Sequence, residues 1–296
     1  MDIFVLQVLA GLSVASVLLL IALGLTFTFG QMNVINMAHG EFIMAGAYTT
    51  YVLQGLLGAS LVGLSFLVSL PVAFMVGGTL GLVLERTLIR HLYGRPLDTL
   101  LVTWGVALML QQLARDLFGA ANVQVKTPSW LDGGLTVAGV TMPWNRIFIL
   151  VLVTAAVIAI WVLVNKRPYG RQMRAVMQNR PLASASGIAT GRVDRRTFFI
   201  GSGLGGIAGV AITLLGSIGP TLGTNYLIDA FLVVVVGGLG QLRGAVVAAI
   251  GLGLLNAFVE YASQASVAKA LILVAIVAFM QFRPQGIFVR RSRAVA

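Results

Sequence analysis

Apolar residues run in long blocks through most of this chain. Three blocks, residues 3–29, 61–84 and 147–164, contain no ionisable residue. A helix needs about 20 apolar residues to cross a bilayer core of about 30 Å, so each block predicts a membrane-spanning helix. Shorter apolar stretches, several of them rich in glycine, predict further spans at residues 97–113, 198–215, 230–242, 245–259 and 270–282.

These blocks, with a more polar segment at residues 33–54, predict an all-α fold: a polytopic transmembrane bundle of eight or nine spans, some short or broken. No linker separates folding units, so residues 1–296 are expected to form a single transmembrane domain. The chain is 58% hydrophobic and 10% charged, whereas about a quarter of a soluble domain is charged. The first block has no basic flank and is too long for a signal peptide, which favours a retained span.

The net charge of +11 reflects basic connections between spans rather than a surface for nucleic acid. Cytoplasmic connections of membrane proteins carry an excess of Lys and Arg. This rule predicts a periplasmic N-terminus and a cytoplasmic C-terminus for a multi-pass chain. The basic residues that carry the prediction are Arg86, Arg90, Arg95, Lys166, Arg167, Arg171, Arg174, Arg180, Arg192, Arg195, Arg196, Arg290, Arg291 and Arg293.

The cytoplasmic connection at about residues 165–197 contains a helical stretch between Pro168 and Pro181, with apolar residues on one side and arginines on another. Two interpretations remain open: an amphipathic helix lying on anionic lipid, or a helix that binds a partner protein. The residues that define the stretch are Arg171, Met173, Arg174 and Met177.

Two ionisable residues, His39 and Glu41, interrupt the apolar segment 33–54. A charge at the bilayer centre costs about 2.5–3.5 kcal/mol on insertion scales, so its presence needs a reason. Glu41 is expected to pair with an arginine or cap a half-helix, to line an aqueous path, or to lie near the membrane edge. Because the two residues are two positions apart on a helix, their side chains point about 200° apart. We expect Glu41 to brace a neighbouring helix and His39 to face the path.

A second polar stretch, residues 219–229, contains Pro220, Gly223 and Asn225. These residues predict an external loop, because irregular backbone at membrane depth survives only where protein or water satisfies its amides. Asp229 is then expected to open the next span.

The sequence shows no catalytic constellation and predicts neither a metal site nor a cofactor. The chain has two histidines and no cysteine, and none of its three lysines follows a glycine. The phosphate-binding pattern GxxxxGK[ST] is therefore absent, and any ATP hydrolysis must come from another chain.

Four longer stretches occur in order along the chain. They read INMAHGEFIMAGAY (residues 35–48), GRQMRAVMQNRPLASASGI (170–188), DAFLVVVVGGLGQLRGAVVAA (229–249) and RPQGIF (283–288). Together they resemble the membrane subunits of the branched-chain amino-acid type of ATP-binding-cassette (ABC) importers. The resemblance covers nearly the whole chain.

Within that family the sequence looks most like the urea-transport branch, although Gln241 and Arg243 stand where that branch often carries Asn and Trp. Urea is therefore the predicted solute, with branched-chain amino acids or other amides as the alternative. The stretches that carry the likeness are residues 47–54, 93–105, 128–131 and 219–231.

The resemblance implies a non-enzymatic permease subunit in a bacterial inner membrane, working by alternating access. It further implies a homologous second permease, two cytoplasmic ATPase subunits that contact the helix near Arg171 and Arg174, a periplasmic solute-binding protein and surrounding lipid, but no nucleic acid. A secondary transporter or channel and a membrane-embedded enzyme are the remaining, weaker hypotheses. The candidate residues of the substrate pathway are Asn36, His39, Glu41, Thr49, Thr50, Gln54, Asn225 and Asp229.

Overall fold

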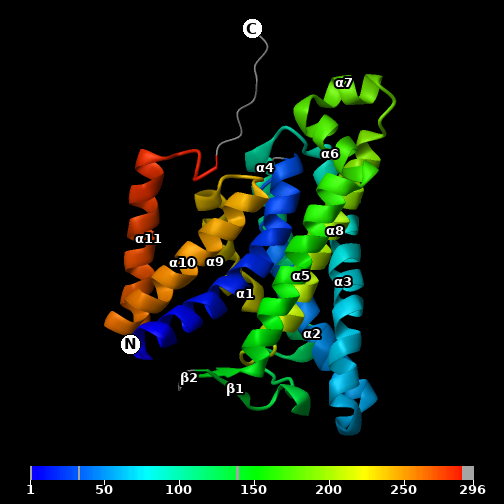
Figure 1. Ribbon diagram of the computed structural model, residues 1–296. Coiled ribbons are helices and arrows are strands. Elements are labelled where there is room, and N and C mark those ends of the chain that lie inside the picture. Colours follow the sequence, from blue (N-terminus) through cyan, green and yellow to red (C-terminus); the bar gives the residue numbers. More distant parts are fainter. Residues whose placement is uncertain (1, 33, 138–139, 289–296) are drawn as a thin grey trace.

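The computed structural model describes residues 2–32, 34–137 and 140–288, which form a bundle of helices (Figure 1). The helices, in chain order, are α1 (Asp2–Met32), α2 (His39–Leu57), α3 (Val62–Thr87), α4 (Pro96–Phe118), α5 (Trp144–Lys166), α6 (Pro168–Gln178), α7 (Arg180–Ala185), α8 (Thr190–Ile212), α9 (Leu222–Gly237), α10 (Leu242–Ala262) and α11 (Ala265–Phe282). Short elements complete the list: the 3₁₀ helices Ala59–Leu61, Ile89–His91 and Ser129–Leu131, and the strands β1 (Gly134–Val137) and β2 (Val140–Pro143).

The structure confirms a helical membrane bundle. Five helical segments of the described chain are long and apolar enough to cross a bilayer, and α9 and α11 are shorter apolar helices. The number of spans stays a prediction, because α2 and α8 begin with polar turns. The five segments are Ile3–Met32, Ala59–His91, Pro96–Phe118, Trp144–Lys166 and Leu242–Ala262.

The long helices alternate in direction, so the bundle has two distinct ends (Figure 1). The N-terminal end of α1 lies at the same end as the antiparallel β1–β2 hairpin, and α6 and α7 lie at the other. We call these the hairpin end and the α7 end. The hairpin is an exception to the all-α prediction.

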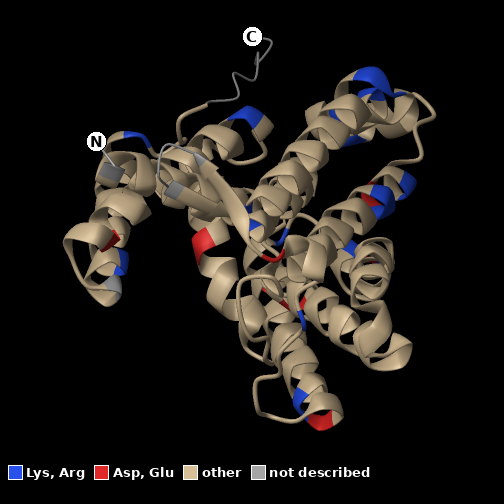
Figure 2. Ribbon diagram, turned by 60° about the horizontal axis from the view of Figure 1, so that its bottom comes forward, with Lys and Arg blue, Asp and Glu red and all other residues tan. Residues whose placement is uncertain are grey.

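Charged side chains gather near the ends of the helices, with long uncharged stretches between them (Figure 2). The α7 end receives the end of α3, the start of α4, and the α5–α8 connection, and these segments hold most of the basic residues named above. The three C-terminal arginines at positions 290, 291 and 293 lie outside the described residues. The charge distribution is what the positive-inside rule expects if the α7 end faces the cytoplasm.

The core is built where glycines let helix backbones touch. A Cβ added to Gly46 of α2 would lie 2.1 Å from the carbonyl oxygen of Gly206 in α8, and one added to Gly209 would lie 1.9 Å from that of Ile43. Small residues permit this approach, and in lipid such packing, rather than exclusion of water, holds helices together. α8 packs in this way against α1, α2 and α3.

Several helices keep broad apolar faces uncovered within the described chain. α4 exposes Leu101, Trp104 and Leu108, and α11 exposes Val274 and Val277. Apolar faces of this extent require lipid or another subunit as their neighbour.

Candidate functional site

Glu41 lies in a buried polar cluster shared by three helices. Its side chain is 1% exposed, and its Oε1 accepts hydrogen bonds from Gln111 Nε2 of α4 at 2.9 Å and from Thr224 Oγ1 of α9 at 3.3 Å. Gln111 also donates to Thr224 Oγ1 at 2.8 Å. The cluster ties α2, α4 and α9 together inside the bundle.

The starts of α2 and α9 meet beside this cluster. A Cβ on Gly40 would lie 2.6 Å from the carbonyl oxygen of Gly223, and one on Gly223 would lie 2.0 Å from that of Gly40. The two helices run in opposite directions, so their N-termini converge inside the bundle. Helix N-termini favour negative charge, which explains how Glu41 is held although it forms no ion pair within the described chain.

α2 begins only at His39, after the irregular residues 34–38. Asn36 and Thr103 hold that segment: Asn36 Oδ1 accepts a hydrogen bond from Ala38 N at 3.1 Å, and Thr103 Oγ1 accepts one from Met37 N at 3.1 Å. Asn36 is 3% exposed and lines a cavity of about 200 Å³ between α1, α4 and α9.

His39 lies in the packed interior rather than in a described cavity. A Cβ on Gly24 of α1 would lie 2.6 Å from its Cε1, and one on Gly205 of α8 would lie 3.2 Å away. Its ring makes an edge contact with Phe42 at 6.1 Å between centroids. Neither ring nitrogen has a hydrogen bond of good geometry, and the Ile21 backbone is the polar group beside the ring. His39 thus wedges α2 between α1 and α8.

The other predicted residues of α2 make local contacts. The hydroxyls of Thr49 and Thr50 donate to the carbonyls of Ala45 and Gly46 at 2.7 and 3.4 Å. Gln54 exchanges hydrogen bonds with the backbone of Lys126 at 2.8 and 2.9 Å, which fastens the end of α2 to the connection before the hairpin.

The predicted pathway residues do not meet in one cavity. Glu41 and Thr49 line a mostly apolar cavity of about 390 Å³ between α2, α3 and α4. Asp229 lines a separate cavity of about 260 Å³ near the hairpin end. Asn225 is exposed on α9. Their roles in transport remain predictions.

The prediction of an external loop over residues 219–229 is wrong for most of that stretch. α9 begins at Leu222 and includes Gly223, Asn225 and Asp229, so Asp229 lies about two turns inside the helix instead of opening it. Gly223 serves close packing on Gly40 rather than ending the helix.

The predicted amphipathic stretch forms α6, which ends at Gln178; Asn179 then caps the separate short helix α7 by accepting from Leu182 N at 2.9 Å. Met173 is 6% exposed and packs on the bundle. Met177 is partly buried, whereas Arg171 and Arg174 lie on the exposed face. Met173 therefore anchors α6 to its own chain, and the arginines are the coupling candidates that a partner can reach.

A polar network joins the α6–α7 segment to the spans. Arg180 of α7 forms an ion pair with Asp194 of α8, whose side chain is 0% exposed. Asp194 Oδ1 also accepts from Gln31 Nε2 of α1 at 3.3 Å. Thr197 of α8 donates to Gln31 and shares a hydrogen bond with Tyr169 of α6.

The network continues to the α3–α4 connection. The guanidinium of Arg180 lies 4.7 Å from the centroid of the Tyr93 ring, and the Tyr93 hydroxyl donates to Glu85 Oε1 of α3 at 2.8 Å. Burial raises the pKa of Tyr169 to about 12 and raises the pKa of Tyr93 as well, so both hydroxyls stay protonated. No motif in the sequence marks this network, because its members are scattered along the chain.

A membrane bundle with a buried carboxylate cluster and a surface segment connected to its spans has the architecture of a transport subunit. The chain belongs to the family described as "Branched-chain amino acid transport system / permease component", whose model matches residues 7–280. No solved structure gives a significant match.

Relatives cover nearly the whole chain. It is 28% identical over 292 residues to the high-affinity branched-chain amino acid transport system permease protein BraD of Pseudomonas aeruginosa, covering 96% of this chain and 95% of the relative. It is 28% identical to LivH of Escherichia coli over 86% of this chain and 85% of the relative. A probable LivH of Methanocaldococcus jannaschii is 26% identical over 92% and 89%. These names support the amino-acid alternative better than the urea prediction.

Proposed function

We propose that this chain is a permease subunit of an ATP-driven importer for branched-chain amino acids. The proposal rests on the match to branched-chain amino acid permeases over residues 7–280. The network that connects α6 and α7 to the spans supports it. A homologous second permease, two cytoplasmic ATPase subunits and a periplasmic binding protein complete the proposed complex. The uncovered apolar face of α4 offers one surface for the second permease or for lipid.

We place the α7 end in the cytoplasm and the hairpin end in the periplasm, with eight or nine spans. The basic segments at the α7 end support this orientation. Because the chain has no cysteine, introduced thiols report their position without interference. Asp132→Cys and Gln178→Cys should therefore react with a membrane-impermeant thiol reagent from opposite sides of the membrane. Reaction from the same side would contradict this topology.

Urea is the second candidate solute, because residues 47–54, 93–105, 128–131 and 219–231 resemble the urea-transport branch of the family. The two solutes are separated by uptake into proteoliposomes that contain the whole importer, with ATP inside and the binding protein outside. We expect ATP-dependent uptake of radiolabelled leucine that excess isoleucine or valine suppresses and excess urea does not. Uptake of labelled urea, with no uptake of leucine, would overturn the amino-acid assignment.

A further inference from the structure

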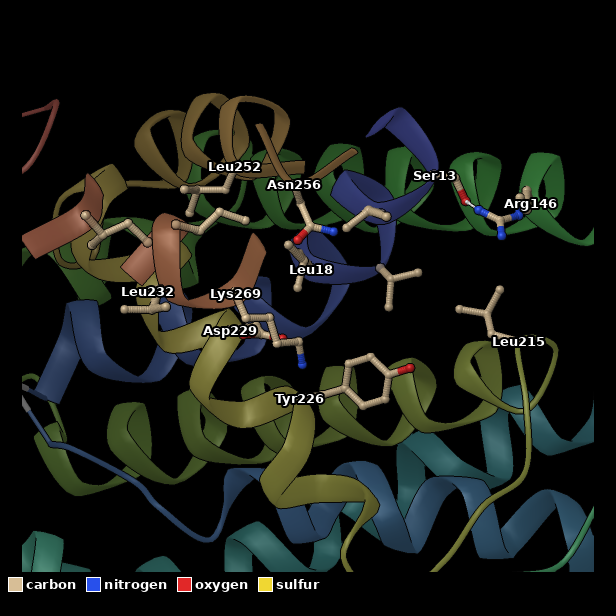
Figure 3. A pocket seen from close by; sticks show the side chains of 14 residues that line it. Ser13, Leu18, Arg146, Leu215, Tyr226, Asp229, Leu232, Leu252, Asn256 and Lys269 are labelled. Carbon is tan, nitrogen blue, oxygen red and sulfur yellow. Dashed lines mark hydrogen bonds between the residues drawn. The ribbon is translucent and has the colours of Figure 1, made fainter. Parts of the chain in front are cut away.

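A cavity of about 260 Å³ lies between α1, α5, α9, α10 and α11 (Figure 3). It lies towards the hairpin end, where α5 and α11 begin, because Arg146 lies in the first turn of α5 and Lys269 about one turn into α11. Ligand pockets for drug-sized molecules span roughly 300–1,000 Å³, so this one suits a smaller solute. Its polar lining consists of Ser13, Arg146, Tyr226, Asp229, Asn256 and Lys269.

The cavity presents charges of both signs. Arg146 and Ser13 lie towards one end of the view in Figure 3, where Arg146 Nη1 donates to Ser13 Oγ at 2.7 Å, and Asp229 and Lys269 lie towards the other. Lys269 acts electrostatically on Asp229, yet the two do not form an ion pair. One carboxylate and two cationic groups therefore face the same cavity, and no salt bridge joins the carboxylate to either cation.

The rest of the lining is aliphatic and mostly branched. Val14, Val17 and Leu18 of α1 supply one wall, and the opposite side is formed by α9, α10 and α11 through Leu232, Leu252, Ile272 and Ile276. Such a wall favours an apolar side chain, because burying each methylene gains about 0.8 kcal/mol. A small neutral amide would leave both the charges and the apolar wall unused.

We propose that this cavity is a solute-binding site for a zwitterionic α-amino acid with a branched aliphatic side chain. Asp229 receives the ammonium group, Lys269 beside it receives the carboxylate, and the aliphatic wall holds the side chain. The inference rests on the proposed function, and it places the site on the side where a periplasmic binding protein would deliver the solute. It assigns to Asp229 a role separate from the Glu41 cluster.

The test is equilibrium binding of radiolabelled leucine to the purified, detergent-solubilised importer without ATP or binding protein, together with uptake in proteoliposomes. We expect leucine to bind, and neither 4-methylpentanoate, which lacks the ammonium group, nor 3-methylbutylamine, which lacks the carboxylate, to displace it at equal concentration. Asp229→Asn and Lys269→Gln should each weaken binding about tenfold or more, since each removes a charged hydrogen-bond partner of the solute.

Three further variants make the result specific. Asp229→Glu should restore part of the affinity, and Arg146→Gln, at the other end of the cavity, should weaken binding less than Lys269→Gln does. Asp132→Asn removes an exposed carboxylate outside the cavity and should bind leucine as the parent does.

The experiments distinguish an error in the assignment of this site from an error in the proposed function. If the parent importer takes up leucine but Asp229→Asn, Arg146→Gln and Lys269→Gln all bind and transport it normally, this cavity is not the site although the permease function stands. Displacement by 4-methylpentanoate or inorganic phosphate as effective as by leucine would instead reveal a simple anion site and would overturn the proposal. If the parent takes up urea and no leucine, the proposed function itself fails.

Discussion

Arg180→Gln is expected to lower ATP-driven solute uptake about 5- to 150-fold, the range of typical coupling free energies between sites, while basal ATP hydrolysis continues. Arg180 connects α7 to the buried Asp194 and, through Gln31, to α1. Without it, α7 loses its ion pair with α8, and movement of the α6–α7 segment reaches the spans only through α6, by way of Tyr169 and the packing of Met173. The measurement is the number of solute molecules imported per ATP hydrolysed by the reconstituted complex.

A double variant separates coupling from folding. Arg180→Gln alone leaves the Asp194 carboxylate buried without its ion-pair partner, which destabilises the fold. Removing one partner of a fully buried pair costs roughly 3–5 kcal/mol. The cost is smaller here because the Arg180 side chain is 40% exposed. Arg180→Gln with Asp194→Asn should restore folded yield but not coupling. Recovery of both would show that the pair serves stability alone.

Two other arginines complete this test. Arg192→Gln removes the same charge from an exposed position of α8 that makes no ion pair within the described chain. This variant should import as many solute molecules per ATP hydrolysed as the parent. Arg174→Glu reverses a charge on the exposed face of α6, and we expect it to reduce solute-stimulated ATP hydrolysis. Unchanged stimulation in Arg174→Glu would exclude contact between that face and the ATPase.

Glu41→Leu is expected to be the most destabilising change in the polar cluster. It removes the acceptor that Gln111 and Thr224 share, and each of these two hydrogen bonds contributes about 0.5–1.5 kcal/mol. Glu41→Gln retains an acceptor and loses only the charge favoured by the two helix N-termini, worth about 0.3–1 kcal/mol for each. The thermal unfolding temperature and the yield of assembled complex should fall in the order parent, Gln, Leu.

The matched control is Glu260→Leu, which replaces an exposed carboxylate of α10. Its unfolding temperature should stay close to that of the parent. Equal stability of Glu41→Leu and Glu260→Leu would show that the cluster does not brace α2, α4 and α9.

His39→Ala tests whether the neighbouring residue has a different role. We expect this variant to assemble and yet transport poorly, because the ring keeps α2 in register between Gly24 of α1 and Gly205 of α8. If His39→Ala and Glu41→Gln both assembled and transported like the parent, this segment would have no part in translocation.

The sequence by itself determined the properties that depend on local composition. Apolar blocks such as residues 3–29 must lie in a membrane whatever their neighbours are. The amphipathic helix before Gln178 also follows from a short-range pattern. The quoted stretches further indicated the permease family, which the match over residues 7–280 confirms.

Local patterns misled where packing overrode them. Gly223 and Asn225 predicted a loop, yet both lie in α9, because transmembrane bundles tolerate glycine where a neighbouring backbone approaches closely. Met173 had the features of an exposed anchor for a partner, but the bundle of this chain covers it.

Only the tertiary structure decided which polar groups meet. Glu41 reaches a partner 70 residues away on α4 and another 183 residues away on α9, and Gln31 reaches Asp194 across 163 residues. The cavity that holds Arg146, Asp229 and Lys269 draws on five helices. Hydropathy records whether a segment enters the membrane, but helix pairing depends on the shapes of whole helix faces, so it is the packed bundle that selects these partners.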